Sequence, residues 1–308
     1  MPLLLSETDG RAVLTMPDLI ASMEKALEAF SAGSVVQPVR TIFDIAEHHA
    51  FFGLMPAYLP SAPALGAKLV SVYHTNLAKG LPSHLATILL FDPETGALAA
   101  ILDGRYITEA RTAAVSAVSV KKLARTDSSV LAILGSGVQA HSHFEALAHV
   151  RRFEEVRAWS PTRKNLDEFA AASGARAMAS AEAAVRGADV IVLVTASPTP
   201  VIDDAWVKRG AHVISVGACR PTQQEMDPAL VKRSRLFVDS RAAAVKESGD
   251  VIGAGAEHII AELGETAAIR QTADEVTVFK SLGLAVEDVV AANLALQRAR
   301  AQGIGKTI

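Results

Sequence analysis

The chain has 308 residues, half of them hydrophobic and only 5% aromatic, so it is long enough for two domains. Its 30 basic and 33 acidic residues leave a formal net charge of −3 without a basic stripe, which argues against nucleic-acid or anionic-membrane binding. The single cysteine, Cys219, excludes an intrachain disulfide and a cysteine-based metal site. There is no signal-peptide pattern and no apolar stretch long enough to span a membrane, so we expect a cytoplasmic protein.

The first third of the chain predicts a mixed α/β region. Residues 16–32 show the periodicity of an amphipathic helix. Strand-like runs follow at residues 41–43, 67–72, 86–91 and 98–103. The turn at residues 92–96 predicts that the last two runs form a hairpin. The small residues from 108 to 123 then predict a helix that packs closely on another layer.

A second region, from about residue 120 to 245, alternates short apolar strands with helices. The strands are expected at residues 130–134, 156–159, 190–194, 213–216 and 236–238. This alternation is typical of a parallel sheet covered by helices on both faces. A long Ala-rich helix predicted over residues 281–302 follows, and we expect it to return to the first domain. The predicted domains are therefore residues 119–277, and residues 1–118 together with 278–308.

A glycine-rich turn lies between the first strand of the second region and the helix after it. The pattern is Gly135-x-Gly137-x-x-Ala140, with Val138 and Gln139 at the start of the helix. The first glycine permits a tight turn, the second lets the backbone approach a pyrophosphate, and the alanine keeps the helix close to the sheet. The helix N-terminus supplies amide donors and a positive dipole. The turn therefore predicts a Rossmann domain that binds a nicotinamide dinucleotide.

The end of the next strand bears on which nicotinamide cofactor binds. NAD-specific sites usually carry an Asp or Glu there, which accepts hydrogen bonds from the ribose. Here the segment contains Ser160, Thr162, Arg163 and Lys164 and no acid. Hydroxyls and cations suit a 2′-phosphate, so we expect NADP(H) to be preferred, with NAD(H) possible.

Several separated motifs outside the glycine-rich turn resemble those of one family across essentially the whole chain. They are Gln37-Pro-Val-Arg-Thr41, Ala67-Lys-Leu-Val70, Leu81-Pro-Ser-His-Leu-Ala-Thr87, Arg111-Thr-Ala-Ala114, Val216-Gly-Ala-Cys-Arg-Pro221, Lys246-Glu-Ser-Gly-Asp250 and Thr277-Val-Phe-Lys-Ser-Leu-Gly283. The arrangement resembles the ornithine cyclodeaminase/mu-crystallin family, and within it the mu-crystallin branch of ketimine reductases. The resemblance implies a homodimer in which the Rossmann domain is joined to a substrate-binding and dimerisation domain. It also implies cyclodeamination of ornithine, reversible deamination of alanine, or reduction of cyclic ketimines.

The resemblance places Arg40, Lys68 and Arg111 at the substrate carboxylate. Their chemistry agrees, because the planar guanidinium of arginine can bind both oxygens of a carboxylate. A lysine in a partly dry site can also donate a proton, because burial lowers its pKa. His84 and Glu247 match ligand-side positions of the family. Each residue could instead have a purely structural role, and histidine pairs such as His141 and His143 show no ligand spacing for a metal.

Cys219 departs from the deaminating members, which carry at this position an Asp that takes protons from the substrate amine. An unperturbed thiol has a pKa of about 8.5, and an unperturbed Asp carboxyl has a pKa of about 3.9. Cysteine is therefore a poor replacement for that base. Reduction of a preformed iminium needs a hydride and little further proton transfer. We therefore expect Lys68, Arg111 and Cys219 to be the catalytic positions of a reductase.

The remaining predictions concern the cofactor, since ligands of such sheets bind at the carboxyl ends of the strands. The predicted contacts are Arg111, Thr112, Gly135, Gly137, Val138, Gln139, Ser160, Thr162, Arg163, Thr195, Val216, Ala218 and Ser281. The favoured function is NAD(P)H-dependent reduction of small cyclic ketimines of the pyrroline- or piperideine-2-carboxylate type. The alternatives are an ornithine cyclodeaminase or alanine-dehydrogenase-like enzyme, and a non-catalytic, crystallin-like protein that binds NADP(H) or another small ligand.

Overall fold

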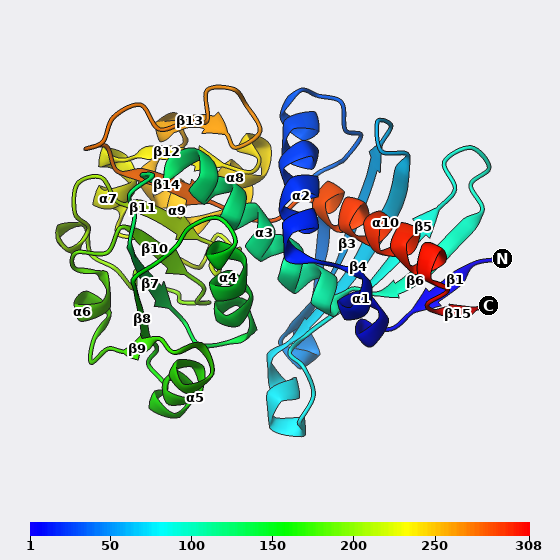
Figure 1. Ribbon diagram of the computed structural model, residues 1–308, viewed down its shortest axis with the longest axis horizontal. Helices are drawn as coiled ribbons and strands as arrows, with labels where there is room; N and C mark the ends of the chain where they lie inside the picture. Colours follow the sequence, from blue (N-terminus) through cyan, green and yellow to red (C-terminus); the bar gives the residue numbers. More distant parts are fainter. The chain divides into compact units, whose positions relative to one another are not determined.

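The computed structural model describes residues 1–308 and divides the chain into two compact units (Figure 1). Unit 1 consists of Met1–Thr112 and Leu284–Ile308, and unit 2 of Ala113–Gly283. The chain therefore leaves unit 1 within one helix, α3 (Arg105–Leu123), and returns to it at Leu284. Each unit is described by itself below. No helix of either unit is both long enough and apolar enough to cross a membrane.

Unit 1 is a mixed sheet of seven strands with helices packed on one face. The strand order is β15-β1-β6-β5-β4-β3-β2, and the two chain ends pair with each other through β1 and β15. The strands are β1 (Leu3–Leu5), β2 (Thr41–Ile45), β3 (Ala50–Leu59), β4 (Ala64–Tyr73), β5 (His84–Phe91), β6 (Leu98–Asp103) and β15 (Lys306–Thr307). The helices are α1 (Glu7–Val13), α2 (Met16–Ser31) and α10 (Ala285–Gln302).

One face of this sheet is covered and the other is open. In β4 alternate residues from Ala64 to Val70 are buried, as expected for a strand with one face in the core. Helix α10 packs on β3, β4 and β5, and α2 packs on α10 (Figure 1). On the opposite face, Phe43, Phe52, Ser71 and Leu85 stand in register across β2, β3, β4 and β5, and none of the four is fully buried. An apolar sheet face thus lies at the surface of unit 1.

Unit 2 contains an eight-stranded parallel sheet in the order β13-β12-β14-β11-β10-β7-β8-β9, so the expected Rossmann architecture is confirmed. Helices lie on both faces of the sheet (Figure 1). The strands are β7 (Val130–Leu134), β8 (Glu155–Trp159), β9 (Arg176–Ala177), β10 (Val190–Leu193), β11 (His212–Ser215), β12 (Arg235–Val238), β13 (Ile259–Glu262) and β14 (Thr277–Lys280). The helices besides the end of α3 are α4 (Val138–Ala148), α5 (Arg163–Ser173), α6 (Ala181–Val185), α7 (Pro228–Arg233), α8 (Arg241–Glu247) and α9 (Gly249–Ala254).

The end of unit 2 differs from the sequence-based expectation. Strand β14 lies between β11 and β12, so unit 2 runs to Gly283, whereas the pattern predicts a boundary after residue 277. The long helix predicted from Ser281 begins instead at Ala285. Asp239 is the cause, because its carboxylate accepts hydrogen bonds from the Leu282 and Gly283 amides at 2.5 and 2.6 Å and holds that segment outside the helix.

Candidate active site

Lys68 lies on the buried face of β4, where it pairs in register with Met55 of β3 and Ile88 of β5. Only 2% of the residue is exposed. Its ammonium has one ion-pair partner, Asp288 of α10, whose Oδ2 lies 2.6 Å from Nζ. A buried charge with a single partner on the covered side of a sheet is unusual for a purely structural lysine.

Asp288 also binds Arg111, and this joins two of the three predicted substrate cations. Arg111 Nε donates to Asp288 Oδ1 at 2.8 Å, and its Nη1 donates to Glu287 Oε2 at 2.6 Å. Both acids are completely buried and belong to the first turn of α10, where negative charge is favoured by the helix dipole. Gln37 caps the same turn by accepting a hydrogen bond from the Val286 amide at 2.8 Å.

Burial dominates the electrostatics of this cluster. It lowers the pKa of Lys68 to about 8, although Asp288 acts in the opposite direction and Arg111 and Arg40 lower it further. For Asp288, burial acts to raise the pKa, but Arg111 and Lys68 together hold it below its ordinary value. The pair is therefore ionised at neutral pH, with an ammonium that gives up its proton more readily than an exposed lysine does.

Arg40 and His84 complete the part of unit 1 that carries predicted site residues. Both are half-buried, and both interact electrostatically with the groups around Lys68. Burial, followed by the charge of Lys68, lowers the pKa of His84 to about 4, so its imidazole is neutral at physiological pH. Thr112, the last residue of unit 1 on α3, donates its hydroxyl to the Thr108 carbonyl at 2.7 Å.

In unit 2 the glycine-rich turn has the geometry that a dinucleotide requires. Gly135 has a φ of +122°, and an added Cβ would lie 2.8 Å from the Val194 carbonyl oxygen, so only glycine fits. A Cβ on Gly137 would meet nothing within 4 Å, which leaves that side of the turn open. Helix α4 follows at once, and the amides of Gly137, Val138 and Gln139 donate to no group in the protein. The turn therefore fits a pyrophosphate.

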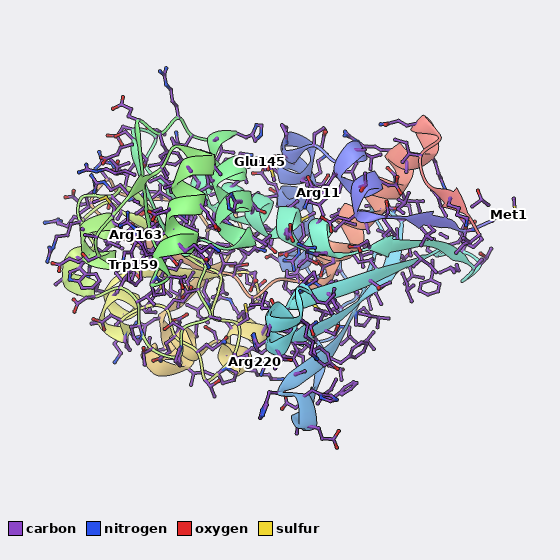
Figure 2. All side chains as sticks on the ribbon, turned by 90° about the horizontal axis from the view of Figure 1, so that it is seen from below. Met1, Arg11, Glu145, Trp159, Arg163 and Arg220 are labelled. Carbon is purple, nitrogen blue, oxygen red and sulfur yellow. The ribbon has the colours of Figure 1, made fainter.

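Some side chains of the segment after β8 already form contacts with other residues of the protein. Trp159 and Arg163, near its ends, are labelled in Figure 2. Ser136 of the glycine-rich turn donates its hydroxyl to Ser160 Oγ at 2.9 Å, which places Ser160 beside the turn. Thr162 caps α5 without a side-chain hydrogen bond, and the exposed Arg163 forms an ion pair with Asp167 at 2.8 Å. A phosphate at Arg163 would therefore compete with Asp167.

A buried carboxylate fixes the backbone at the carboxyl ends of β10 and β11. Glu225 Oε1 accepts hydrogen bonds from the amide and hydroxyl of Thr195, at 2.6 and 2.9 Å. Its Oε2 accepts from the Ser215 hydroxyl and from the amides of Gly217 and Ala218, at 2.9, 2.9 and 3.2 Å. An added Cβ on Gly217 would overlap the Thr195 carbonyl oxygen, so the two strand ends lie in direct contact.

Lys280 supplies the opposite charge beneath this loop. Its ammonium donates to the Ala218 carbonyl at 2.6 Å and to Ser215 Oγ at 2.9 Å, and it lies 3.1 Å from Asp250 Oδ2. The side chains of Lys280, Ser215 and Asp250 are all buried. Burial acts to lower the pKa of Lys280, but Asp250 and Glu225 raise it above its ordinary value, so the ammonium stays charged. Glu225 lies outside the motifs quoted above, and Lys280 lies within the Thr277–Gly283 motif, where the sequence analysis assigned it no role.

The other predicted residues of unit 2 occupy several environments. Cys219 is half-buried and donates its thiol to the Val216 carbonyl at 3.1 Å. Val216 and Ala218 are buried, and Ser281 is buried with its amide bonded to the Ser215 carbonyl. Glu247 is the half-buried last residue of α8. The roles predicted for these residues stay predictions.

The chain matches the model of the ornithine cyclodeaminase/mu-crystallin family over residues 2–303. The chain belongs to this family. Among its relatives is the ketimine reductase mu-crystallin of Rattus norvegicus, which is 50% identical over 283 residues, 90% of each chain. A Delta(1)-pyrroline-2-carboxylate reductase of Bacillus cereus is 34% identical over 99% of each chain.

Two solved structures of the family share the fold over nearly the whole chain. The Thermococcus litoralis Delta(1)-pyrroline-2-carboxylate reductase, in complex with NADH and L-proline, has a TM-score of 0.95 and 38% identity and covers 99% of this chain and 100% of its own. An archaeal alanine dehydrogenase dimer with bound NAD has a TM-score of 0.94 and 31% identity and covers 100% and 98%. These relatives support an oxidoreductase that uses a nicotinamide cofactor.

Proposed function

We propose that this protein is an NAD(P)H-dependent reductase of small cyclic ketimines that carry a carboxylate next to the C=N bond. The observation that carries the proposal is the buried cluster of unit 1, in which Lys68 and Arg111 are held together by Asp288. Two adjacent cations suit a carboxylate, and a lysine with a lowered pKa suits proton transfer to an imine nitrogen. The ketimine and pyrroline-carboxylate reductases among the relatives support the same reaction.

Each unit has a separate task in this proposal. Arg111 and Arg40 bind the substrate carboxylate, and the Lys68 ammonium keeps the imine nitrogen protonated, which makes the imine carbon more electrophilic. The glycine-rich turn and the N-terminus of α4 hold the pyrophosphate of the dinucleotide in unit 2. The bound nicotinamide supplies the hydride. At residue 219 of unit 2 a cysteine stands in place of the Asp of the deaminating members, which supports reduction over deamination.

The assay that tests the proposal is steady-state turnover of piperideine-2-carboxylate and pyrroline-2-carboxylate with NADPH and with NADH. We expect substrate-dependent oxidation of the nicotinamide and formation of the saturated cyclic amino acid. The absence of turnover with both imines and both cofactors would contradict the proposal. Release of ammonia from ornithine or alanine would favour the deaminase alternative, and cofactor binding without any turnover would favour the non-catalytic one.

We further propose that NADP(H) is preferred over NAD(H). The support is the segment after β8, which offers the Ser160 and Thr162 hydroxyls and the Arg163 guanidinium and has no acid before Asp167. Fluorescence titration should give a lower Kd for NADPH than for NADH, and Arg163→Ala should weaken NADPH alone, by about five-fold for an exposed charge pair. Arg186→Ala is the matched control, because Arg186 forms a comparable exposed pair with Glu182. Equal affinities of the unsubstituted protein would contradict the preference.

We also propose that the protein is a homodimer, which uses the open sheet face of unit 1. Phe43 and Leu85 belong to the row of residues across that face and are 55% and 41% exposed. An apolar sheet face left open to water is a common mark of a subunit interface. The single cysteine fits a reducing compartment, so we place the dimer in the cytoplasm.

A further inference from the structure

Asp288 divides its two oxygens between two cations that the proposed reaction needs. Oδ2 lies 2.6 Å from Lys68 Nζ, and Oδ1 accepts from Arg111 Nε at 2.8 Å. Its neighbour Glu287 contacts Arg111 at 2.6 Å and forms no ion pair with Lys68. Asp288 is therefore the one carboxylate that fixes the position of the ammonium relative to the guanidinium.

The charged groups around Lys68 show that Asp288 is needed to balance the charge of the ammonium. Arg111 faces it from α3, Arg40 from the segment before β2, and the neutral His84 from β5. From α10 come Asp288 and its neighbour Glu287, and the residue beside Lys68 on β3 is the uncharged Met55. If Asp288 were neutral, Lys68 would be buried among two guanidinium groups without any direct counter-ion.

We propose that Asp288 is a positioning residue of the reductase, which holds Lys68 as an ammonium aimed at the imine nitrogen and sets Arg111 beside it for the substrate carboxylate. The inference rests on the proposed function. In the reaction, the hydride from NAD(P)H forms the new C–H bond and the π electrons of C=N move to nitrogen. Nitrogen keeps the proton that came from Lys68, and the neutral Lys68 amine takes a proton back from solvent. Asp288 remains a carboxylate throughout.

The test is the pH dependence of kcat for piperideine-2-carboxylate reduction in the unsubstituted protein and in Asp288→Asn. The rate should fall as pH rises through the Lys68 pKa of about 8, because the neutral amine has no proton to give. Without the nearby negative charge that pKa should fall by about one unit or more. The loss of kcat in Asp288→Asn should therefore grow by about five-fold between pH 6 and pH 8. Titration of the substrate is the same for all variants and cancels in the ratio.

Glu287→Gln is the matched control, since it removes an equally buried charge from the adjacent residue but leaves Lys68 its partner. We expect a higher KM, through Arg111, and an unshifted alkaline limb. An equal shift of the limb in both variants, or no shift in Asp288→Asn, would overturn the proposal. Thermal unfolding confirms that each variant is folded. If Asp288→Asn does not fold, Asp288→Glu decides, because a displaced carboxylate should lower kcat at all pH values, and an unchanged kcat would overturn the proposal.

Binding of pyrrole-2-carboxylate, a planar carboxylate that cannot be reduced, separates this inference from the proposed function. Its affinity should fall above about pH 8 in the unsubstituted protein and about one unit lower in Asp288→Asn. If the protein turns over no ketimine but this binding shift occurs, the proposed function fails and the role of Asp288 in holding Lys68 stands. If ketimines are reduced and neither measurement shifts, the inference fails and the function stands.

Discussion

Lys68 occupies a position where a half-covered sheet normally places an aliphatic side chain, between Gly66 and Val70 on the buried face of β4. An unpaired ammonium there would be very costly, and Asp288 offsets that cost without removing the effect of burial on the pKa. The result is a lysine that is charged at neutral pH and yet loses its proton near pH 8.

Cationic candidates are easier to find in a sequence than the acids that arrange them. A lysine or arginine inside an apolar run is conspicuous, as at Lys68 and Arg111, whereas acids in the first turn of a helix occur widely and indicate no site. The available signal for Asp288 is that two adjacent acids interrupt the apolar first half of the helix, whose residues from Ala285 to Ala292 are all buried. Glu225 gives no signal at all, because its partners are mostly main-chain amides, which any residue type supplies.

Cys219 carries a prediction about the class of reaction. We expect Cys219→Asp to gain oxidation of an acyclic amino acid with ammonia release, because a carboxylate can take the proton of the substrate amine and the charged Lys280 nearby favours its ionised form. The measurement, with NAD(P)+ supplied as the oxidant, is ammonia release together with NAD(P)H formation from alanine, and ammonia release from ornithine, because cyclodeamination returns the hydride and forms no net NAD(P)H. Cys219→Asn, which has the same size and no basic group, should not gain this activity. Equal behaviour of the two variants would contradict the prediction.

At the scale of elements, helix α3 binds two buried histidines through two serines. Ser116 Oγ lies 2.9 Å from His143 Nε2 on α4, and Ser119 Oγ lies 3.0 Å from His212 Nε2 on β11. His143 Nδ1 is also 2.7 Å from the Gln139 carbonyl oxygen, so its ring is used within the fold. Burial lowers the pKa of His143 to about 4, and burial together with Arg270 lowers the pKa of His212 to about 3.

These histidines predict a loss of stability in mild acid. An unfolded histidine titrates near pH 6.5, so their contribution is complete above that value and is lost as pH falls toward about 4. Each should lower the free energy of unfolding by about 1.4 kcal/mol per pH unit within this window. Urea unfolding at pH 7, 6 and 5 measures the slope. His143→Gln and His212→Gln should each reduce it, and an unchanged slope in both would contradict the assignment.

We expect the stability of the loop after β11 to depend strongly on the Glu225 carboxylate. Glu225→Gln removes the charge that faces Lys280 and turns two acceptor oxygens into one, so we expect a loss of about 3–5 kcal/mol in the free energy of unfolding. Glu182→Gln on the exposed pair with Arg186 is the control and should cost less than about 1 kcal/mol. Similar losses in the two variants, measured by urea unfolding, would show that the buried carboxylate is not a stabilising centre.

Sequence patterns predict the strands well where nearly every residue of the strand is apolar and buried. The apolar run at residues 130–134 matches β7, and the other predicted strands of the parallel sheet lie within one residue of β8, β10, β11 and β12. Strand β3 gives no such pattern, because Gly53 and Pro56 interrupt it and a proline inside a sheet usually argues against a strand. The start of α10 depends on Asp239, more than forty residues earlier, and no local pattern contains that contact.

For the whole molecule, the open sheet face of unit 1 predicts a subunit interface. We expect the unsubstituted protein to be a dimer in sedimentation equilibrium, and Phe43→Glu to shift it to a monomer, because a charge would be buried against an apolar partner surface. Ile252→Glu is the control, since Ile252 is 49% exposed on α9 in unit 2. A monomeric unsubstituted protein, or an equal effect of both substitutions, would contradict the interface.

The contact between the ends of β10 and β11 determines which residues of the loop can be substituted during evolution. Glu225 holds the loop through main-chain amides of Gly217 and Ala218, and Lys280 holds it through the Ala218 carbonyl. The Cys219 thiol adds one hydrogen bond, to the Val216 carbonyl. Gly217 tolerates no side chain, whereas the half-buried position 219 carries one, and the main-chain bonds to Glu225 and Lys280 do not involve it. Single amino-acid substitutions at residue 219 can therefore change the chemistry of this position during evolution while the surrounding backbone stays the same.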